Sequence, residues 1–206
     1  MLDADLKQIG ILENLAEDEM VQSVRFMGDT AYFVTFRQVD PLFAVDLSDP
    51  ANPTVLSKLK IPGFSAYLHP FGEGRLIGIG YDADEKTGRT EGVKLSLFDI
   101  SDPSNVKEIA KKSVDASYVT VQYNHKAVFA DVESGVIAFP ADNSYFVFRV
   151  SDKGFKEVGR IEIEEMGWDG DVRGVSIDKA FYVVSADRVT VLSFEKMKKI
   201  ADVKFK

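Results

Sequence analysis

The 206 residues comprise 45% hydrophobic and 28% charged side chains, an ordinary globular mixture that argues against a disordered chain. The formal net charge of −8 disfavours a nucleic-acid partner, and the absence of cysteine excludes disulfides, thiolate nucleophiles and cysteine-based zinc sites. No apolar stretch approaches the roughly 18 residues needed to span a bilayer, so we expect no transmembrane segment, and the N-terminal sequence predicts no signal peptide in this chain.

The predicted elements are short β-strands. Each apolar run is rich in aromatic and β-branched residues and is bounded by turn-forming or charged residues. Several runs are apolar at nearly every position, which is typical of strands covered on both faces. Most gaps are too short for the crossover helices of a parallel sheet. In chain order the clearest runs are 31–36, 42–45, 76–79, 95–98, 127–130, 145–148, 181–184 and 189–192.

A tandem repeat organises these runs. The segment LFAVDLSDP at Leu42–Pro50 reappears as LSLFDISDP at Leu95–Pro103, with weaker copies at 145–153 and 189–194. Apolar runs precede each copy, and a turn and a short amphipathic run follow it. Asp hydrogen-bonds its own backbone in turns, and Pro ends strand pairing. A period of roughly 45 to 53 residues with four strands each is typical of the blades of a β-propeller.

We therefore predict an all-β fold, a β-propeller of about four four-stranded antiparallel blades in a single domain over residues 1–206. The ring would be either an open partial propeller or a closed four-bladed one. Residues 6–12 are predicted to form an extra outer strand, from a preceding blade or closing the ring. The expected blades cover residues 20–62, 63–114, 115–164 and 165–206.

The most distinctive segments are 23–29, 34–43, 46–50, 61–65, 67–70, 76–80, 94–99 and 168–174. Together they resemble a family of secreted bacterial and archaeal proteins with a C-terminal β-propeller domain distantly related to WD-40 repeats. The resemblance implies a propeller and an extracellular or cell-surface location for the full-length protein. Members of the family are longer than this chain, so the resemblance implies a C-terminal fragment. It implies no activity and carries over no functional residues.

An open ring would expose the apolar faces of its first and last blades. Exposed apolar patches normally mark an interface, so two chains would pair as a homodimer and complete one larger ring. A closed four-bladed ring is the alternative.

Four residues before the last repeat's first strand are candidates for ligand binding: Trp168, Asp169, Asp171 and Arg173. An aromatic plate beside acids and an arginine suits a sugar or a peptide. The structural alternative is an Asp–Arg ion pair with the tryptophan wedged between blades.

Three further candidates come from other blades. Arg37 and Gln38 lie in a predicted turn, where the arginine would bind an anion or pair with a nearby aspartate. His69 shares a Tyr-x-His pattern with His125. The two histidines would contact a metal or ligand, or they would occupy a repeated packing position.

The long connection at residues 81–92 holds Asp82, Asp84 and Glu85, whose oxygens suit Ca²⁺. The spacing departs from that of an EF-hand, and a solvated hairpin tip is the alternative. We predict no other cofactor.

The sequence favours a non-catalytic interaction module outside the cytoplasm that binds a protein or a glycan. The alternative is a hydrolase or lyase acting on a polysaccharide or peptide, with acids and arginine at the propeller channel. No nucleophile elbow, phosphate-binding loop, dinucleotide-binding glycine pattern or His-Glu-x-x-His motif is present.

Overall fold

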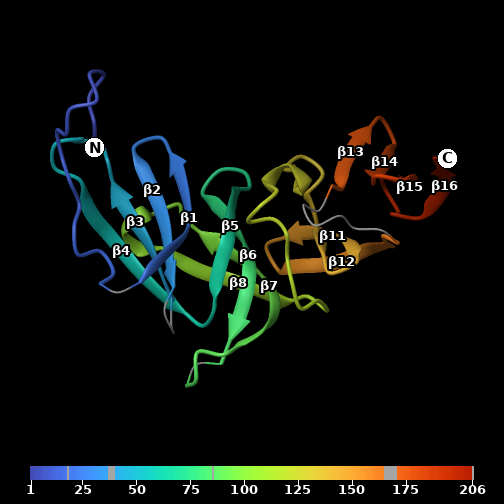
Figure 1. Cartoon of the computed structure of the whole chain (residues 1–206), viewed down its shortest axis with the longest axis horizontal. Coiled ribbons are helices and arrows are strands. Elements are labelled where there is room, and N and C mark those ends of the chain that lie inside the picture. Colours follow the sequence, from blue (N-terminus) through green and yellow to red (C-terminus); the bar gives the residue numbers. More distant parts are fainter. Residues whose placement is uncertain (18, 37–39, 85, 165–170, 206) are drawn as a thin grey trace. The chain divides into compact units, whose positions relative to one another are not determined.

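A computed structural model of the chain consists almost entirely of strands (Figure 1). It describes residues 1–206 except 18, 37–39, 85, 165–170 and 206. The strands are β1 (Met20–Met27), β2 (Thr30–Phe36), β3 (Asp40–Asp46), β4 (Thr54–Ile61), β5 (Phe64–Pro70), β6 (Arg75–Ala83), β7 (Thr90–Asp99), β8 (Lys107–Ser113), β9 (Phe129–Asp131), β10 (Val136–Ala141), β11 (Ser144–Ser151), β12 (Gly154–Glu162), β13 (Arg173–Ile177), β14 (Ala180–Val184), β15 (Arg188–Ser193) and β16 (Lys199–Lys204). Two short 3₁₀ helices are η1 (Pro103–Asn105) and η2 (His125–Ala127). Within the described part of the chain, no helix is both long and apolar enough to cross a membrane.

The strands form four four-stranded antiparallel sheets, and each sheet follows chain order from its first strand to its last. The sheets are β1–β4, β5–β8, β9–β12 and β13–β16. Each lies inside one of the four sequence repeats. The predicted all-β fold of four-stranded antiparallel sheets is therefore confirmed.

The chain divides into two compact units, Met1–Ile109 and Ala110–Lys206. In each unit, two sheets share one buried core. The core of the first unit is built from alternate residues of β2, β3 and β5, among them Tyr32, Leu42 and Leu68, with single residues from β4, β6 and β7. The core of the second unit is built largely from β10, β11, β14 and β15, among them Tyr145, Phe181 and Leu192.

Within each unit, neighbouring sheets meet first strand to first strand. In the first unit β1 lies beside β5 (Figure 1), and in the second β13 contacts β9. At the other end of the first unit's sheets, β4 lies against η1, where the Ser57 hydroxyl donates a 2.7 Å hydrogen bond to the Pro103 carbonyl. In the first unit, the first strands of the two sheets therefore lie side by side and their last strands lie at the same end, as in neighbouring propeller blades.

The repeated Ser-Asp-Pro segments form the turns expected of them. The Asp46 carboxylate accepts from the Ser48 backbone N–H at 2.8 Å, and the Asp99 carboxylate accepts from the Ser101 N–H at 3.0 Å. The bond from the Ser48 N–H is the main cause of the lowered pKa of Asp46, whereas the pKa of Asp99 is lowered mainly by the Ser101 hydroxyl, which donates to it at 2.6 Å, and then by the Ser101 N–H. The repeat therefore encodes the same local turn in two sheets.

The extra strand expected at residues 6–12 does not form, although the structure describes all of these residues. A single bridge pairs Leu2 with Gln8. The Asp3 carboxylate accepts from the backbone N–H groups of Asp5 and Lys7, both at 2.9 Å, which bends the chain into a turn. Gly10 then lies so close to the Pro50 carbonyl oxygen that a Cβ would sit 2.2 Å from it. Residues 6–12 therefore lie against the Ser-Asp-Pro turn at Pro50 and join no sheet.

Candidate functional site

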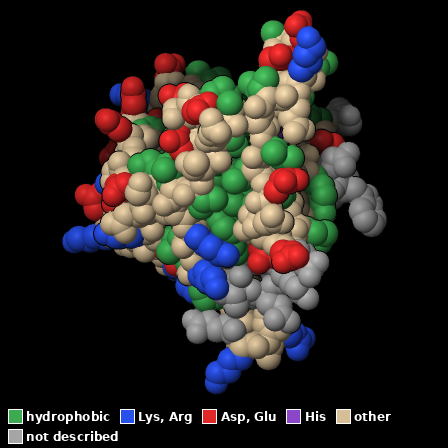
Figure 2. Space-filling view, turned by 90° about the vertical axis from the view of Figure 1, so that its left-hand side faces the viewer, with side chains coloured by type: hydrophobic (Ala, Val, Ile, Leu, Met, Phe, Trp, Pro, Cys, Tyr) green, Lys and Arg blue, Asp and Glu red, His purple; other side chains and the backbone are tan. Residues whose placement is uncertain are grey.

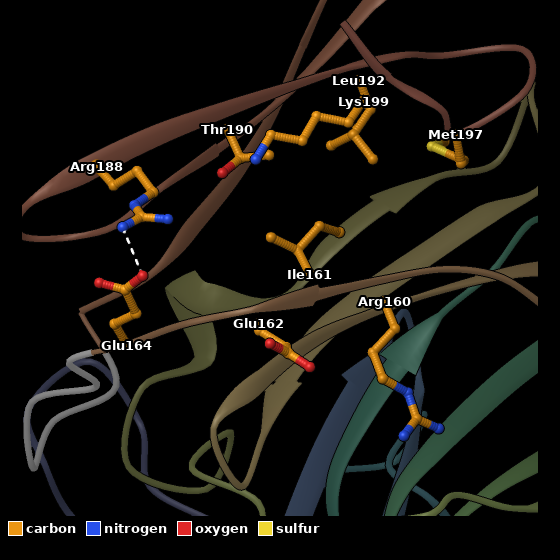
Figure 3. A pocket seen from close by; sticks show the side chains of 9 residues that line it. All are labelled: Arg160, Ile161, Glu162, Glu164, Arg188, Thr190, Leu192, Met197 and Lys199. Carbon is orange, nitrogen blue, oxygen red and sulfur yellow. Dashed lines mark ion pairs between the residues drawn. The ribbon is translucent and has the colours of Figure 1, made fainter. Parts of the chain in front are cut away.

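A pocket of about 480 Å³ lies in the second unit, between β12 and the β15–β16 hairpin (Figure 3). Its floor is apolar, because Ile161 of β12 faces Leu192 and Met197 from the hairpin, and all three belong to the buried core. Its remaining lining is polar and carries charges of both signs, from Arg160, Glu162, Glu164, Arg188, Thr190 and Lys199.

Ion pairs join the two sides of this pocket. Arg188 at the start of β15 reaches Glu164, which follows β12, at 2.8 Å (Figure 3). The second guanidinium nitrogen of Arg188 lies 3.5 Å from Asp202 of β16. Asp202 also pairs with Lys199 at 2.5 Å and accepts from the Thr190 hydroxyl at 2.8 Å. The Lys199 bond, followed by that from Thr190, lowers the pKa of Asp202, so this carboxylate is ionised at neutral pH.

Arg160 borders the pocket from β12, next to Ile161. Its guanidinium lies 4.5 Å from the centre of the Phe146 ring, and it pairs with Glu157 at 3.1 Å and Asp115 at 3.0 Å. These contacts, with Glu157 the largest contribution, raise the pKa of Arg160. Arg160 pairs with Phe146 across the strands and Ile161 pairs with Tyr145, so the stacked guanidinium lies on the face of the sheet opposite Ile161 (Figure 3).

A second cluster lies in the first unit, where β1 meets β5. Arg25 of β1 donates from Nε and Nη2 to the Leu68 carbonyl, at 2.9 and 2.6 Å. Its guanidinium carbon lies 5.5 Å from the centre of the Tyr67 ring. The Tyr67 hydroxyl is 2.9 Å from Nδ1 of His69. Burial, and then the charge of Arg25, lowers the pKa of His69, so its imidazole is neutral at physiological pH.

Comparison with known proteins decides the family. A family model described as a beta propeller domain matches residues 1–197. The chain belongs to this family of beta propeller domains. Each four-stranded sheet is therefore a blade.

Related proteins occur in archaea. The chain is 36% identical over 205 residues to an uncharacterised protein of Archaeoglobus fulgidus and, again over 205 residues, to one of Methanocaldococcus jannaschii. It spans 31% of the length of each relative.

Two solved structures of AztD from Citrobacter koseri have a similar fold. The apo AztD structure matches with a TM-score of 0.55 at 13% identity, over 91% of this chain and 47% of AztD. The other matches with a TM-score of 0.57 at 14% identity, over 90% of this chain and 47% of AztD. At this identity the likeness concerns the propeller fold alone.

The structure places some of the predicted ligand-binding residues. His69 lies in the Arg25 cluster. Asp171 is exposed just before the last blade, and Arg173, the first residue of β13, donates from its own Nη1 to the Val172 carbonyl at 3.0 Å. Neither Asp171 nor Arg173 lines the pocket of the second unit. The other predicted binding residues, Trp168, Asp169, Arg37 and Gln38, lie outside the described residues.

The two Tyr-x-His segments occupy different positions in the fold. His69 is a half-buried strand residue, whereas His125 is exposed and begins η2. The shared pattern therefore does not mark equivalent blade positions.

The loop proposed for Ca²⁺ uses its described carboxylates in local contacts. Asp82 lies 3.8 Å from the ammonium group of Lys94, which is almost fully buried. Asp84 accepts from the backbone N–H and the hydroxyl of Thr87, both at 2.8 Å, and Thr87 is the main cause of its lowered pKa. The third predicted ligand, Glu85, lies outside the described residues. Across the part of the chain that is described, no group of three or more acidic or histidine side chains is placed to hold a metal ion.

Sequence reasoning missed Arg25, Glu164, Arg188 and Lys199. The partners of Arg25, and Glu164 as the nearer partner of Arg188, belong to a neighbouring blade, so no local pattern marks these contacts. One available signal was the alternation along β15, which places Arg188, Thr190 and Leu192 on one face.

Proposed function

We propose that this propeller domain is a non-catalytic interaction module that acts outside the cytoplasm and binds a protein segment in the pocket of the second unit. The observation that carries the proposal is the pocket's composition, an apolar floor bordered by charges of both signs. Binding sites typically combine apolar surface with a few placed polar groups. The extracellular setting, and the place of this chain as the C-terminal part of a longer protein, rest on the resemblance to the secreted propeller family.

A protein ligand suits this pocket better than a glycan. No aromatic side chain is among the described residues that line it, so this part of the lining offers no flat ring for a sugar to stack on. The charges of Arg188 and Lys199 on one side and Glu162 on the other would instead pair with charged side chains of a bound segment.

The directions in which the pKa values of the described carboxyl groups are shifted support binding over hydrolysis. A glycosidase needs one carboxylic acid whose pKa is raised so that it can donate a proton. Among the described carboxyls, each one with a shifted pKa is shifted downward; these are Asp46, Asp49, Asp84, Asp99 and Asp202.

Selection from a phage-displayed library of random peptides tests this proposal. The full chain should enrich peptides of a common charge pattern, and Lys199→Glu combined with Glu162→Lys should weaken their binding about tenfold or more. The matched control is Lys198→Glu, a neighbouring exposed residue outside the pocket lining, which should bind as the unaltered chain does.

Other outcomes would contradict the proposal. Binding confined to a glycan array would assign the pocket to a carbohydrate. Cleavage of a polysaccharide or peptide panel, abolished by the same pocket variants, would make the domain a hydrolase or lyase.

We also propose a second copy of this chain as a partner, through the outer faces of the end blades. On the last blade, Val175, Tyr182 and Val191 are successive cross-strand partners and so share the face opposite the core. Ile177 on the same face is 56% exposed. On the side of the molecule that holds the N-terminal segment, Figure 2 shows hydrophobic side chains gathered in the middle and charged ones around them. Phe26 of the first blade is 64% exposed.

Light scattering over a wide concentration range tests the pairing. The unaltered chain should form a dimer, and Phe26→Lys and Ile177→Lys should each shift it to monomer. Val132→Lys, at an exposed hydrophobic residue in a turn of the third blade, is the control and should leave the dimer intact. A monomer at every concentration would contradict the pairing.

A further inference from the structure

We propose that the cluster of Arg25, Tyr67 and His69 in the first unit binds the carboxylate of an acidic side chain from a protein partner. This site is separate from the pocket of the second unit, so the proposal does not depend on that pocket. Arg25 is a half-buried cation, and no carboxylate among the described residues pairs with it. In a chain of net charge −8, a cation placed in this way favours an external anion.

The Arg25 guanidinium has hydrogen-bond donors that no described residue uses. Arg25 directs Nε and Nη2 to one acceptor, the Leu68 carbonyl, and these bonds fix the plane of the group. Its Nη1 makes no hydrogen bond within the described structure. A planar guanidinium that is already held by the backbone loses little conformational entropy when it binds a carboxylate.

His69 adds a second donor. The Tyr67 hydroxyl, 2.9 Å from Nδ1, serves as the donor to that nitrogen when the imidazole proton is on Nε2. Burial, and then the charge of Arg25, lowers the pKa of His69, which keeps the ring neutral. No described residue accepts a hydrogen bond from Nε2, so its N–H can donate to a ligand. Arg25 and His69 together would offer two hydrogen-bond donors of different residues to one anion.

The geometry favours an acidic side chain over an acidic sugar. The guanidinium of Arg25 lies over the Tyr67 ring. The centre of the His69 ring lies 5.8 Å from the centre of the Tyr67 ring. The guanidinium therefore covers one face of the tyrosine ring, on which a sugar ring would otherwise stack. The cluster recognises charge and hydrogen-bond geometry, which a glutamate or aspartate side chain supplies.

Nuclear magnetic resonance provides a direct test, because the chain contains two histidines only. The imidazole signals of His69 report on the site, and those of exposed His125 serve as an internal reference. We expect hexaglutamate peptide to shift the His69 signals saturably and leave those of His125 in place. Hexaglutamine peptide, of equal length without charge, should shift neither.

Variants of the full chain then identify the cation. Arg25→Gln should weaken hexaglutamate binding about tenfold or more, because a charged hydrogen bond is lost. Arg25→Lys keeps the charge and should retain part of the binding, which also covers the case in which Arg25→Gln does not fold. Arg89→Gln, at an exposed arginine of the same unit, is the matched control and should bind as the unaltered chain does.

Three results would overturn the proposal. The first is an unshifted His69 at millimolar hexaglutamate. The second is an equal loss of binding in Arg25→Gln and Arg89→Gln, which would indicate nonspecific attraction. The third is a response to hexagalacturonate without one to hexaglutamate, which would assign the site to an acidic glycan.

Discussion

The phenol of Tyr145 on β11 donates a 2.7 Å hydrogen bond to the carbonyl of Ala127 at the end of η2. Tyr145 is fully buried, and burial raises the pKa of its hydroxyl far above the ordinary value, so it remains a donor throughout the pH range of a folded protein. This bond ties the segment before β9 to the centre of the third blade.

Tyr145→Phe should therefore lower the free energy of unfolding by about 1–3 kcal/mol, because the buried Ala127 carbonyl loses its donor. Urea unfolding measures the change. Tyr182→Phe, at a half-buried tyrosine on the outer face of the last blade, is the control and should change stability little. Equal effects of the two substitutions would contradict the role assigned to this hydrogen bond.

Gly174 of β13 packs closely against the preceding blade. A Cβ there would sit 2.5 Å from the Tyr145 hydroxyl oxygen and 2.8 Å from the Phe181 ring. Because both neighbours are fully buried, they have no room to yield, and Gly174→Ala should cost about 1–3 kcal/mol of stability. Thermal unfolding tests this against Ser176→Ala, an exposed position of the same strand. An unchanged melting temperature for Gly174→Ala would show that the blades separate more easily than this packing implies.

His69 should make stability depend on pH in a defined direction. Its pKa is lower in the folded chain than its ordinary value of 6.5, so below about pH 6.5 the unfolded chain binds more protons than the folded one. The contribution of the neutral His69 imidazole to stability is complete above that pH and is lost as the pH falls. From about pH 7.5 to about pH 5, the unaltered chain should lose more stability than His69→Gln.

The matched control for this measurement is His125→Gln, which removes the exposed histidine and should follow the pH profile of the unaltered chain. The shifted aspartates do not interfere in this window, because their lowered pKa values place their titration in more acidic solution. A pH profile for His69→Gln that matches that of the unaltered chain would contradict the lowered pKa of the half-buried His69.

The ion pair of Arg188 and Glu164 should contribute to the shape of the pocket more than to stability. Its side chains are 21% and 58% exposed, so solvent screens their attraction. A double-mutant cycle with Arg188→Gln and Glu164→Gln should give a coupling of about 0.2–1 kcal/mol that shrinks in high salt. A coupling several times larger, or one insensitive to salt, would indicate a pair shielded from water.

Several features could be predicted because they depend on neighbouring residues. The Ser-Asp-Pro turns are local: Asp46 and Asp99 each bond a backbone N–H two residues ahead, as their sequence predicts. The N-terminal segment was predicted less well, since residues 6–12 have the composition of an outer strand. The Asp3 turn and the contact of Gly10 with the Pro50 carbonyl redirect the chain, and that contact has no local signal.

The sequence by itself determined the four-stranded repeat and the all-β fold, because alternation, turn residues and a recurring period are short-range properties of the chain. Only the tertiary structure decided which functional groups meet. Arg25 reaches Tyr67 and His69, and Glu164 reaches Arg188, because adjacent blades align their strands across their shared cores. Such contacts join side chains of different repeats, and their geometry depends on how two sheets pack, which no single repeat encodes.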